Sequence, residues 1–350
     1  MGDESNMIPR GPKLRIGVLG SAGQLGRCLV RHIEAADDLD LAFAATRDQI
    51  DLSDFDQIDP WLEAESSALP DLVVNAAAYT KVDSCETEKE LAYRMNALAP
   101  AEWARRCLQR NIQFFHVSTD YVFRGDGSRP YREEEPTDPR TVYGSSKRAG
   151  EVAVLGTNPS ALVVRTSWVF GPGRNFVIAI LDQAARRRSG ELEGPLKVVD
   201  DQYGAPTYAG DLAEALLLLG RIGRSTASYP SGLLHLRNAG EATWFSFARA
   251  ILDQAGYADI VIDPVPTSAF ETAAPRPAYS LLCMDRAVAA GVIMRNWSEA
   301  LAAYLKSLDV PRNLLSNVFS NGWGAGGEET RGIAGSDGIT KTSATRPEAE

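Results

Sequence analysis

Tyr143 and Lys147, in the segment YGSSK, have the side-chain types and the spacing that a carbonyl reduction needs. On a helix, side chains four residues apart lie on one face. A tyrosine hydroxyl can protonate a carbonyl oxygen while a hydride reaches the carbon, and a neighbouring ammonium is expected to lower the pKa of that hydroxyl from its ordinary value of about 10. Thr119, at the end of an apolar run, would hydrogen-bond the same oxygen. We predict that Thr119, Tyr143 and Lys147 are catalytic, although an isolated YxxxK is more often a surface pattern.

A glycine-rich turn with the spacing GxxGxxG, formed by Gly20, Gly23 and Gly26, follows the apolar run LRIGVLG. Glycines in this position allow a tight turn and bring a pyrophosphate close to the free N–H groups of a helix N-terminus. The same sequence could make a strand–helix turn that binds nothing. Because the turn follows the first predicted strand and opens a predicted helix, we interpret it as a dinucleotide site.

The end of the second predicted strand bears on the choice of cofactor. An arginine there accommodates the 2′-phosphate of NADP, whereas an acidic residue holds the ribose of NAD. Arg47 stands at this point and Asp48 follows it, so the signal is mixed. We favour NADPH, with Arg47 as the partner of the 2′-phosphate, and leave NADH open. Asp51 and Leu52 are predicted to lie beside the adenine.

The elements that must position these residues alternate along the first half of the chain. Short, apolar, β-branched segments that alternate with helical ones predict a parallel sheet covered on both faces. The fold class is therefore α/β, a Rossmann-like doubly wound parallel sheet with a smaller C-terminal α/β lobe that binds substrate. The predicted strands are residues 14–20, 39–46, 71–78, 111–119 and 161–170, and the predicted helices are 24–33, a crossover within 86–110, and 143–155.

The second half is less regular, and the last residues change in composition. We predict a flexible N-terminus over 1–13, a NAD(P)-binding domain over 14–170, a mainly substrate-binding lobe over 171–312 with segments that return to the first sheet, and a disordered tail over 313–350. The tail is rich in Gly, Ser, Thr and Glu and has too few large apolar residues to order itself.

Composition narrows the class of protein. The chain has 350 residues, a net charge of −10 and 44% hydrophobic residues, which excludes a wholly disordered chain. The negative charge argues against nucleic-acid binding. No apolar run approaches the roughly 20 residues of a membrane span, and the N-terminus lacks a signal-peptide core. Four scattered cysteines and three histidines make a metal site a poor interpretation. We expect a cytoplasmic protein.

Several segments resemble the extended short-chain dehydrogenase/reductase superfamily and, within it, the dTDP-4-dehydrorhamnose reductase family. STDYVF, SWVF and DQxGxPT are specific, whereas GxxGxxG alone is not. The resemblance extends over about residues 14–308. The matching segments are GxxGQLG (20–26), NAAAYTKVD (75–83), MNALAP (95–100), STDYVFRG (118–125), YGSSK (143–147), RTSWVFGPGRNF (165–176), DDQYGAPTY (200–208) and RPAYSLL (276–282).

The resemblance implies reduction of the C4 keto group of dTDP-4-dehydro-L-rhamnose to dTDP-L-rhamnose with NAD(P)H. Thr119, Tyr143 and Lys147 match the catalytic residues of the family, with Tyr143 as general acid. Contacts to the cofactor are implied, besides the glycines, Tyr143 and Lys147, for Gln24, Leu25, Ala76, Ala77, Tyr79 and Asn96. Contacts to the nucleotide sugar are implied for Tyr121, Trp168, Asn175 and Gln202.

Two features depart from the family or stay open. Many relatives carry His where this chain has Tyr79. Some members dimerise around a Mg²⁺ ion held by glutamates, but no such ligands can be matched here, so no metal-binding residue is named and the protein is either a monomer or a homodimer.

Other functions remain open on the same fold. One is another nucleotide-sugar 4-ketoreductase or an epimerase; a dehydratase is disfavoured because Tyr121, not Glu, follows Asp120. Another is a non-catalytic, cofactor-sensing regulatory subunit that resembles the regulatory subunit of methionine adenosyltransferase. The intact Thr119, Tyr143 and Lys147 favour an enzyme.

Overall fold

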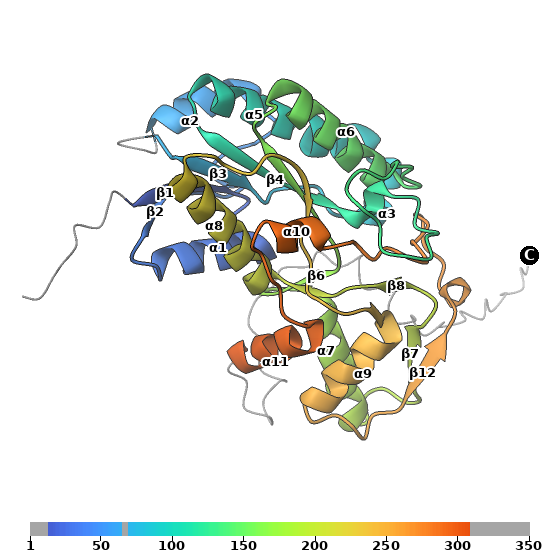
Figure 1. Ribbon diagram of the computed structural model, residues 1–350. Coiled ribbons are helices and arrows are strands. Elements are labelled where there is room, and N and C mark those ends of the chain that lie inside the picture. The colour runs from blue at the N-terminus through green and yellow to red at the C-terminus, as the bar shows by residue number, and fades with distance from the viewer. Residues whose placement is uncertain (1–12, 65–68, 309–350) are drawn as a thin grey trace, which may run out of the picture.

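A six-stranded, entirely parallel sheet forms the centre of the larger lobe (Figure 1). The computed structural model describes residues 13–64 and 69–308. The strand order is β10–β5–β4–β3–β1–β2, so the direction of winding reverses between β1 and β3. This arrangement confirms the predicted α/β class. The strands are β1 Leu14–Leu19, β2 Leu39–Ala45, β3 Leu72–Asn75, β4 Gln113–Thr119, β5 Leu162–Thr166 and β10 Gly232–His235.

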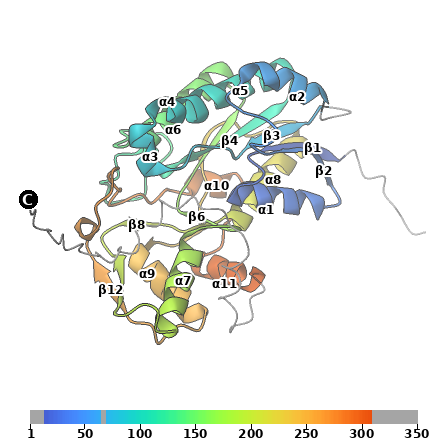
Figure 2. The same cartoon turned by 180° about the vertical axis from the view of Figure 1, so that it is seen from behind.

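Helices cover both faces of this sheet, as Figures 1 and 2 show. α1 (Gln24–Glu34) and α8 (Ala209–Thr226) lie on one face, and α2 (Ile58–Ala64), α5 (Ala99–Gln109) and α6 (Val142–Thr157) lie on the other. Successive residues of a strand point to opposite faces, so each strand contributes to two cores. In β3, for example, Leu72 and Val74 join the core under α1 and α8, whereas Val73 joins the core that contains Trp103 of α5.

The crossover between β3 and β4 is broken into short helical pieces. α3 (Val82–Thr87) and α4 (Lys89–Tyr93) lead into a π-helical turn, η2 (Arg94–Leu98), which runs directly into α5. The sequence predicted a crossover helix within 86–110, and the structure contains these segments in its place. π-Helical turns are often found at functional sites, and this one carries Asn96. Short 3₁₀ turns lie elsewhere in the described residues: η1 Phe55–Gln57, η3 Asp120–Val122 and η4 Thr267–Ala269.

The prediction of a single strand over 161–170 is wrong. The chain leaves the sheet after β5 and forms a separate short strand, β6 (Val169–Phe170), which pairs with β9 (Thr207–Tyr208). The break falls at Trp168, whose φ is 45°. Large side chains rarely adopt this left-handed conformation, and it cannot be part of a continuous strand. The apolar run concealed this change of direction because both parts are largely buried.

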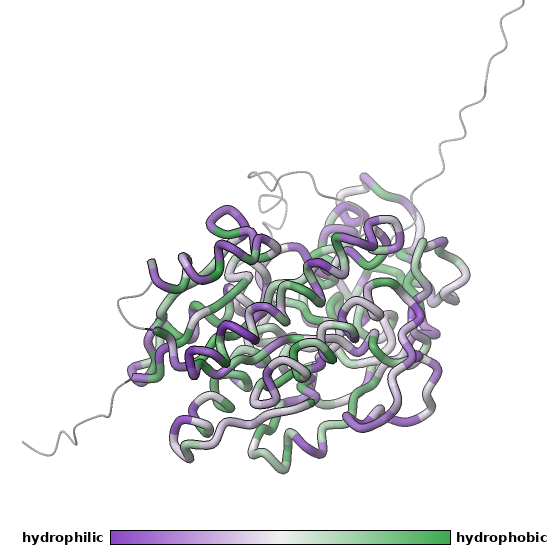
Figure 3. The backbone as a smooth tube through the Cα atoms, turned by 90° about the horizontal axis from the view of Figure 1, so that it is seen from above, coloured by the Kyte–Doolittle hydropathy of each residue, from purple (hydrophilic) through white to green (hydrophobic). Residues whose placement is uncertain are grey.

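A smaller lobe contains α7 (Phe176–Arg188), α9 (Trp244–Gln254) and α11 (Trp297–Ser307). It has its own core, to which Phe170, Phe247 and Tyr304 contribute. Figure 3 shows how hydrophobic and hydrophilic residues alternate along the folded part of the chain. Two strand pairs lie in this part of the chain, β7 (Leu196–Val199) with β12 (Ile262–Val265), and β8 (Tyr203–Gly204) with β11 (Ala242–Thr243).

The two lobes are not consecutive along the chain. After β9, the chain returns to the larger lobe to form α8 and β10, and α10 (Asp285–Ala289) contributes Ala287 to the same core. The domain limits at 170 and 312 therefore stay a prediction. The later segments α8, β10 and α10 do lie in the larger lobe. The predicted flexible N-terminus, apart from Lys13, and the predicted disordered tail lie outside the described residues.

Candidate functional site

The glycine-rich turn joins the carboxyl end of β1 to α1, and its shape depends on the absence of side chains. Gly20 has a φ of 76°, and a Cβ there would lie 2.8 Å from the backbone of Ala77. A Cβ on Gly26 would lie 2.2 Å from the carbonyl oxygen of Gly20. Gly23 is the N-cap of α1 and has no side chain to cap the N–H groups of the first turn. This cradle fits the phosphates of a dinucleotide, which bind such N–H groups.

Gln24 and Leu25 begin α1 and differ in position. Leu25 is buried in the core, so only its backbone is available to a ligand. Gln24 is half-buried, and its amide donates a hydrogen bond of 3.4 Å to the carbonyl oxygen of Arg174. The turn thus lies close to the segment that leads into the smaller lobe.

The loop after β3 lies against this turn. Ala76 and Ala77 are half-buried there, and Ala77 touches Gly20. Tyr79 is buried, and its hydroxyl donates to Glu88. Asn96 is fully buried: its amide oxygen accepts the N–H of Tyr79 at 2.8 Å and its amide nitrogen donates to the carbonyl of Tyr79. Asn96 therefore fixes the conformation of the loop through its two hydrogen bonds to the backbone of Tyr79. Its contact with a cofactor stays a prediction.

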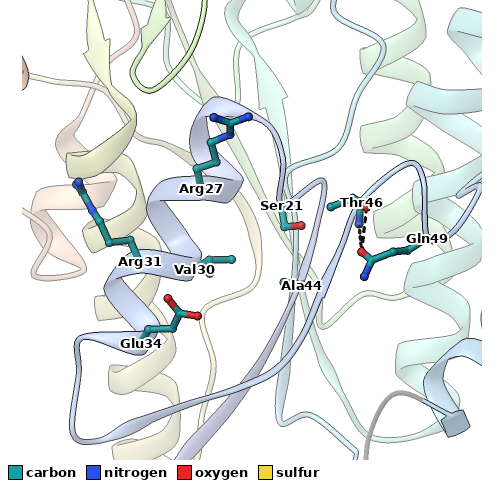
Figure 4. Close-up of a pocket in the computed structure, with 8 residues that line it drawn as sticks. All are labelled: Ser21, Arg27, Val30, Arg31, Glu34, Ala44, Thr46 and Gln49. Carbon is teal, nitrogen blue, oxygen red and sulfur yellow. Dashed lines mark hydrogen bonds between the residues drawn. The ribbon is translucent and has the colours of Figure 1, made fainter. Parts of the chain in front are cut away.

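A hollow of about 470 Å³ lies between α1 and the end of β2 (Figure 4). Ser21, Thr46 and Gln49 line one part of it, and Gln49 accepts hydrogen bonds from Thr46. Arg27, Val30, Arg31 and Glu34 line the side formed by α1, and Ala44 of β2 lies opposite them. The adenosine end of a dinucleotide bound to the glycine turn would reach this region. The sequence did not single out Arg27.

The residues predicted to hold the adenosine are grouped at the same end of β2. Arg47 is exposed, next to the hollow-lining Thr46. Asp51 accepts hydrogen bonds from the backbone and side chain of Ser53, and these bonds hold the pKa of Asp51 below its ordinary value. Leu52 is half-buried. The location suits a cofactor, but the ligand contacts of these three residues stay predictions.

Thr119 and Tyr143 meet at the carboxyl edge of the sheet. Thr119 is the last residue of β4, and its side chain lies close enough to the phenol of Tyr143, in the first turn of α6, to act on the pKa of that phenol. Thr141 caps this helix by accepting the N–H of Gly144 at 3.0 Å, which starts α6 in the register that presents Tyr143. The predicted pair is therefore brought together by the end of one strand and the start of one helix.

Lys147 lies one turn further along α6 and is 1% exposed. Its ammonium group or amine donates to the carbonyl oxygen of Val117 at 2.7 Å and lies 3.2 Å from Nε2 of His116. Burial lowers the pKa of Lys147 from 10.5 to about 8, against the opposing effect of Glu151. His116 is fully buried, and burial, followed by the charge of Lys147, holds its pKa well below the ordinary value.

The predicted lowering of the tyrosine pKa by the lysine is wrong in this structure. Burial raises the pKa of Tyr143 above 10, and the neighbouring Thr119 offsets only part of that increase. The Lys147 nitrogen is directed at Val117 and His116, and burial outweighs the other influences on this pKa. The phenol therefore keeps its proton at neutral pH, which suits a general acid.

Close packing fixes α6 against its neighbours. A Cβ on Gly144 would lie 2.2 Å from the carbonyl oxygen of Tyr121, and a Cβ on Gly150 would lie 2.1 Å from that of Asn96. One turn after Lys147, the buried Glu151 forms two hydrogen bonds of 2.8 and 2.7 Å with the buried Arg165 of β5. Removing one member of such a pair costs about 3–5 kcal/mol, so this contact locks the helix onto the sheet.

Asp120 is a buried carboxyl group beside the reactive phenol. Its Oδ1 accepts a hydrogen bond of 2.9 Å from the hydroxyl of Thr119, and Ser280 is a second polar neighbour. Burial raises the pKa of Asp120 to about 6. The next residue, Tyr121, is half-buried, with its ring centroid 5.5 Å from that of Tyr143. Tyr121 therefore lies next to Tyr143, and its contact with a substrate stays a prediction.

An aromatic cluster, defined as Trp168, Phe176 and Trp244, is formed by the residue before β6 and the first residues of α7 and α9. The rings of Trp168 and Trp244 are stacked 3.7 Å apart, and Phe176 lies 4.6 Å from Trp244. Trp168 also covers Gly204, where a Cβ would come within 2.7 Å of the indole. Gln202 accepts a hydrogen bond from Trp244 and donates one to Thr267. The sequence did not identify Trp244, because its position at the start of a helix carries no signal of its own.

Asn175 caps α7 rather than projecting from a loop. Its Oδ1 accepts the N–H of Ile178, and its amide nitrogen donates to the carbonyls of Gly171 and Gly173 and to the hydroxyl of Tyr304. An asparagine is a typical N-cap residue, so a helix predicted to begin at Phe176 would have revealed this role. Substrate contacts of Asn175 and Gln202 stay predictions, and the hydrogen bonds described here give both residues a structural role.

Metal and membrane features were also sought in the described part of the chain. Residues 13–64 and 69–308 contain no group of three or more His, Cys, Asp or Glu side chains that could hold a metal ion. Within the same residues, no helix combines the length and the apolar character that crossing a bilayer requires.

Comparisons with known proteins agree with this geometry. The family model described as RmlD substrate binding domain matches residues 14–310. A dTDP-4-dehydrorhamnose reductase of Mycobacterium tuberculosis is 39% identical over 86% of this chain and 95% of its own length. A probable dTDP-4,6-dihydroxy-2-methyloxan-3-one 4-ketoreductase of Streptomyces antibioticus is 40% identical over 81% of this chain and 92% of its own length.

A solved structure gives the same result. The dTDP-4-dehydrorhamnose reductase of Bacillus anthracis, determined in complex with NADP, superimposes with a TM-score of 0.75 at 32% sequence identity. The match covers 84% of this chain and 99% of that one.

Proposed function

Because the chain belongs to the dTDP-4-dehydrorhamnose reductase family, we propose that it reduces the C4 keto group of dTDP-4-dehydro-L-rhamnose to give dTDP-L-rhamnose, with NADPH as the reductant. The observation that carries this proposal is the meeting of Thr119, Tyr143 and Lys147 at the carboxyl edge of the sheet. Ligands of open α/β sheets bind at this edge, next to the point where the strand order reverses.

The residues of the site divide the chemistry among them. A reduced nicotinamide, when bound, supplies the hydride for the carbonyl carbon. Tyr143 holds its proton because burial raises its pKa, and it gives that proton to the carbonyl oxygen as the oxygen becomes an alkoxide. Thr119 orients the phenol, and Asp120 fixes the hydroxyl of Thr119 by accepting its hydrogen bond. Lys147 supplies a donor one helical turn away.

The cofactor would lie along the glycine turn, with its phosphates on the first turn of α1 and its adenosine toward the hollow near Ser21 and Thr46. Arg47, and Arg27 on the opposite side, bring positive charge to this region and support a preference for NADPH over NADH. No Mg²⁺ requirement is proposed. A cytoplasmic location and a monomeric or homodimeric state remain predictions from the sequence.

The relative from Streptomyces antibioticus favours a second candidate, the 4-keto reduction of a different dTDP sugar. Both candidates use the same residues, and the substrate separates them. The decisive experiment measures NADPH oxidation with a panel of 4-keto nucleotide sugars and identifies the products by NMR. We expect turnover with dTDP-4-dehydro-L-rhamnose to exceed that with every other sugar.

Turnover of a different dTDP keto sugar alone would establish the second candidate, and no turnover at all would contradict both. An epimerase would retain NAD⁺ through purification, whereas a reductase must exchange its nucleotide. The nucleotide content of the purified protein therefore provides an independent check.

A further inference from the structure

Residues 267–280 form a linking segment between the smaller lobe and the larger one. The segment begins at η4, just after β12, and ends at the buried Ser280. Figures 1 and 2 show the chain running from β12 past α3 toward α10. Between the two ends, Ser268, Glu271 and Ala273 are exposed. The course of the segment therefore depends on what holds it at each end.

The first residue of the linking segment, Thr267, is fixed beside the aromatic cluster. Asp201 accepts the backbone N–H of Thr267 at 2.9 Å and its hydroxyl at 2.5 Å. The side-chain amide of Gln202 donates to the same hydroxyl oxygen at 2.9 Å and accepts a hydrogen bond from the indole of Trp244. This end of the segment is therefore tied to the residues that support the stacked tryptophan rings.

An ion pair between Asp83 and Arg276 fixes the linking segment to the larger lobe. The guanidinium group of Arg276 donates to both carboxylate oxygens of Asp83, at 3.1 and 2.5 Å, and the backbone N–H of Ala274 donates to Oδ1 at 2.9 Å. Burial raises the pKa of Asp83, but these hydrogen bonds outweigh it and hold the pKa below its ordinary value. A two-pronged bond between arginine and a carboxylate fixes geometry as well as adding energy.

The helix that carries Asp83 also contacts the catalytic tyrosine. Asp83 lies in the first turn of α3, and Cys85 follows it on the same helix. Cys85 forms a small buried cluster with Tyr79 and Ala92, and Tyr143 packs against this cluster. The ion pair therefore joins the linking segment to a helix that is itself packed against the site.

After Arg276 the linking segment follows the loop that continues from η3. Pro277 lies against Gly125, where a Cβ would come within 2.5 Å of the proline ring. The N–H of Tyr279 donates to the carbonyl oxygen of Gly125 at 2.9 Å. These contacts set the course of the backbone just before Ser280.

Ser280 lies next to the buried carboxyl group of Asp120. Ser280 is 2% exposed, and its side chain is close enough to Asp120 to act on the pKa of that carboxyl group. Oδ1 of Asp120 accepts the hydroxyl of Thr119 at 2.9 Å. Oδ2 and the hydroxyl oxygen of Ser280 are both buried, and among residues 13–64 and 69–308 no third group forms a hydrogen bond with either atom. Ser280 is therefore placed to satisfy the second oxygen of Asp120.

We propose that the Asp83–Arg276 pair holds the linking segment in the position in which Ser280 donates to Oδ2 of Asp120. The two members of the pair and Ser280 are then positioning residues of the catalytic site. Asp120, held at both oxygens, orients the hydroxyl of Thr119 beside the reactive phenol. The role in catalysis rests on the function proposed above, whereas the fixing of the segment by the pair does not.

The first test needs no substrate. Arg276→Gln removes the two-pronged bond, so we expect the backbone N–H groups of Tyr279 and Ser280 to exchange with solvent about tenfold faster or more, as hydrogen exchange followed by NMR reports. Arg221→Gln is the matched control, because Arg221 makes a two-pronged pair with Asp38 at the amino edge of the sheet. The control should leave the exchange of both groups unchanged. Unchanged exchange in Arg276→Gln overturns the proposal.

The second test asks whether the ion pair acts through Ser280. We expect Ser280→Ala and Arg276→Gln each to lower kcat about fivefold at saturating keto sugar, as the loss of one hydrogen bond would, with the Kd of NADPH unchanged. Because both changes remove the same contact, the double variant should be about as slow as Ser280→Ala alone. Losses that multiply to about 25-fold would show that the two sites act independently, and that result overturns the proposal.

A conservative variant separates the geometry of the pair from its charge. Arg276→Lys keeps the positive charge but cannot form both bonds to Asp83 in the same plane, so we expect it to recover only part of the lost kcat. If Arg276→Gln does not fold, Arg276→Lys takes its place in both tests. Faster exchange of Tyr279 and Ser280 in a protein that reduces no keto sugar would remove the proposed function and leave the fixing of the segment intact.

Discussion

The carboxyl edge of the sheet and the aromatic cluster, which we propose to serve one site, are held together in different ways. At the sheet edge, buried polar side chains are held by hydrogen bonds, as at Thr119, Lys147 and Glu151. In the cluster, Trp168 and Trp244 offer ring surface that is fixed by stacking. The difference leads us to expect that changes at the sheet edge disturb the chemistry more than changes in the aromatic cluster do.

The first prediction concerns the reacting group. Tyr143→Phe removes the proton donor without changing the ring, so we expect kcat to fall about a hundredfold or more, since general acid catalysis contributes about 10²–10⁴. NADPH affinity, measured by fluorescence titration, should be unchanged. Tyr93→Phe, at a partly exposed position on α4, is the matched control and should retain full turnover. Normal turnover of the Tyr143 variant would refute the assignment.

The second prediction concerns the backbone cradle. In Gly26→Ala the new methyl group meets the carbonyl oxygen of Gly20 at 2.2 Å, so the turn must shift. We expect the free energy of unfolding to fall by about 1–3 kcal/mol and NADPH binding to weaken, by calorimetry. Gly156→Ala, where a Cβ meets nothing within 4 Å, should instead gain about 0.5–1 kcal/mol. Similar losses of stability and NADPH affinity in both variants would show that the close approach of Gly26 to Gly20 is not required for cofactor binding.

The third prediction concerns the adenosine end. Arg47→Ala removes an exposed charge beside the hollow, and a hydrogen bond to a charged group is worth about 1.5–3 kcal/mol. We expect the Kd of NADPH to rise about tenfold or more, with the Kd of NADH nearly constant. Equal changes for the two nucleotides would exclude Arg47 as a partner of the 2′-phosphate. Arg27→Ala, measured in parallel, shows whether the opposite side of the hollow takes this role.

The fourth prediction concerns the aromatic cluster. Trp244→Ala removes one ring of the stack, and an aromatic pair contributes about 0.5–1.5 kcal/mol beyond its buried area. We expect the KM of the keto sugar to rise about fivefold while kcat and NADPH affinity stay within twofold. A fall in kcat as large as that of Tyr143→Phe would show that the aromatic cluster matters as much for the chemical step as the residues at the sheet edge.

The fifth prediction concerns pH. The pKa of Asp120 is raised to about 6, so its carboxylate accepts the hydroxyl of Thr119 above pH 6 and loses that acceptor role as it is protonated below pH 6. We expect kcat to decline severalfold as the pH falls through about 6. Asp120→Asn should be slower at neutral pH and should not show this decline. An identical acid limb in both proteins would exclude Asp120 as its origin.

The sheet and the catalytic residues were accessible from sequence because both depend on local patterns. Continuous apolar strands and the i,i+4 spacing of Tyr143 and Lys147 can be recognised in a short stretch of sequence. The pKa of Tyr143 did not follow from spacing, since it depends on burial and on where the Lys147 nitrogen points. The contact of Arg276 with Asp83 joins segments far apart in the chain, which no local pattern contains.

The smaller lobe was less predictable for a related reason. Strands of two residues, such as β6 and β8, carry no periodicity, and the break at Trp168 occurs within an apolar run that looks like one strand. Trp244 acquires its role only because α9 brings it onto Trp168. Such surfaces are set by contacts between distant segments.

The position of β10 at the border of the sheet, next to β5, has a consequence for how the protein is made. When Thr166 has been synthesised, five of the six strands of the sheet exist and only β10 is missing. Until Gly232–His235 is synthesised, one side of β5 keeps unpaired N–H and C=O groups. Open strand borders of this kind pair readily with other chains. During this interval the nascent chain depends on chaperones or on rapid translation to avoid aggregation. We expect slow translation of the segment between β5 and β10 to increase aggregation most.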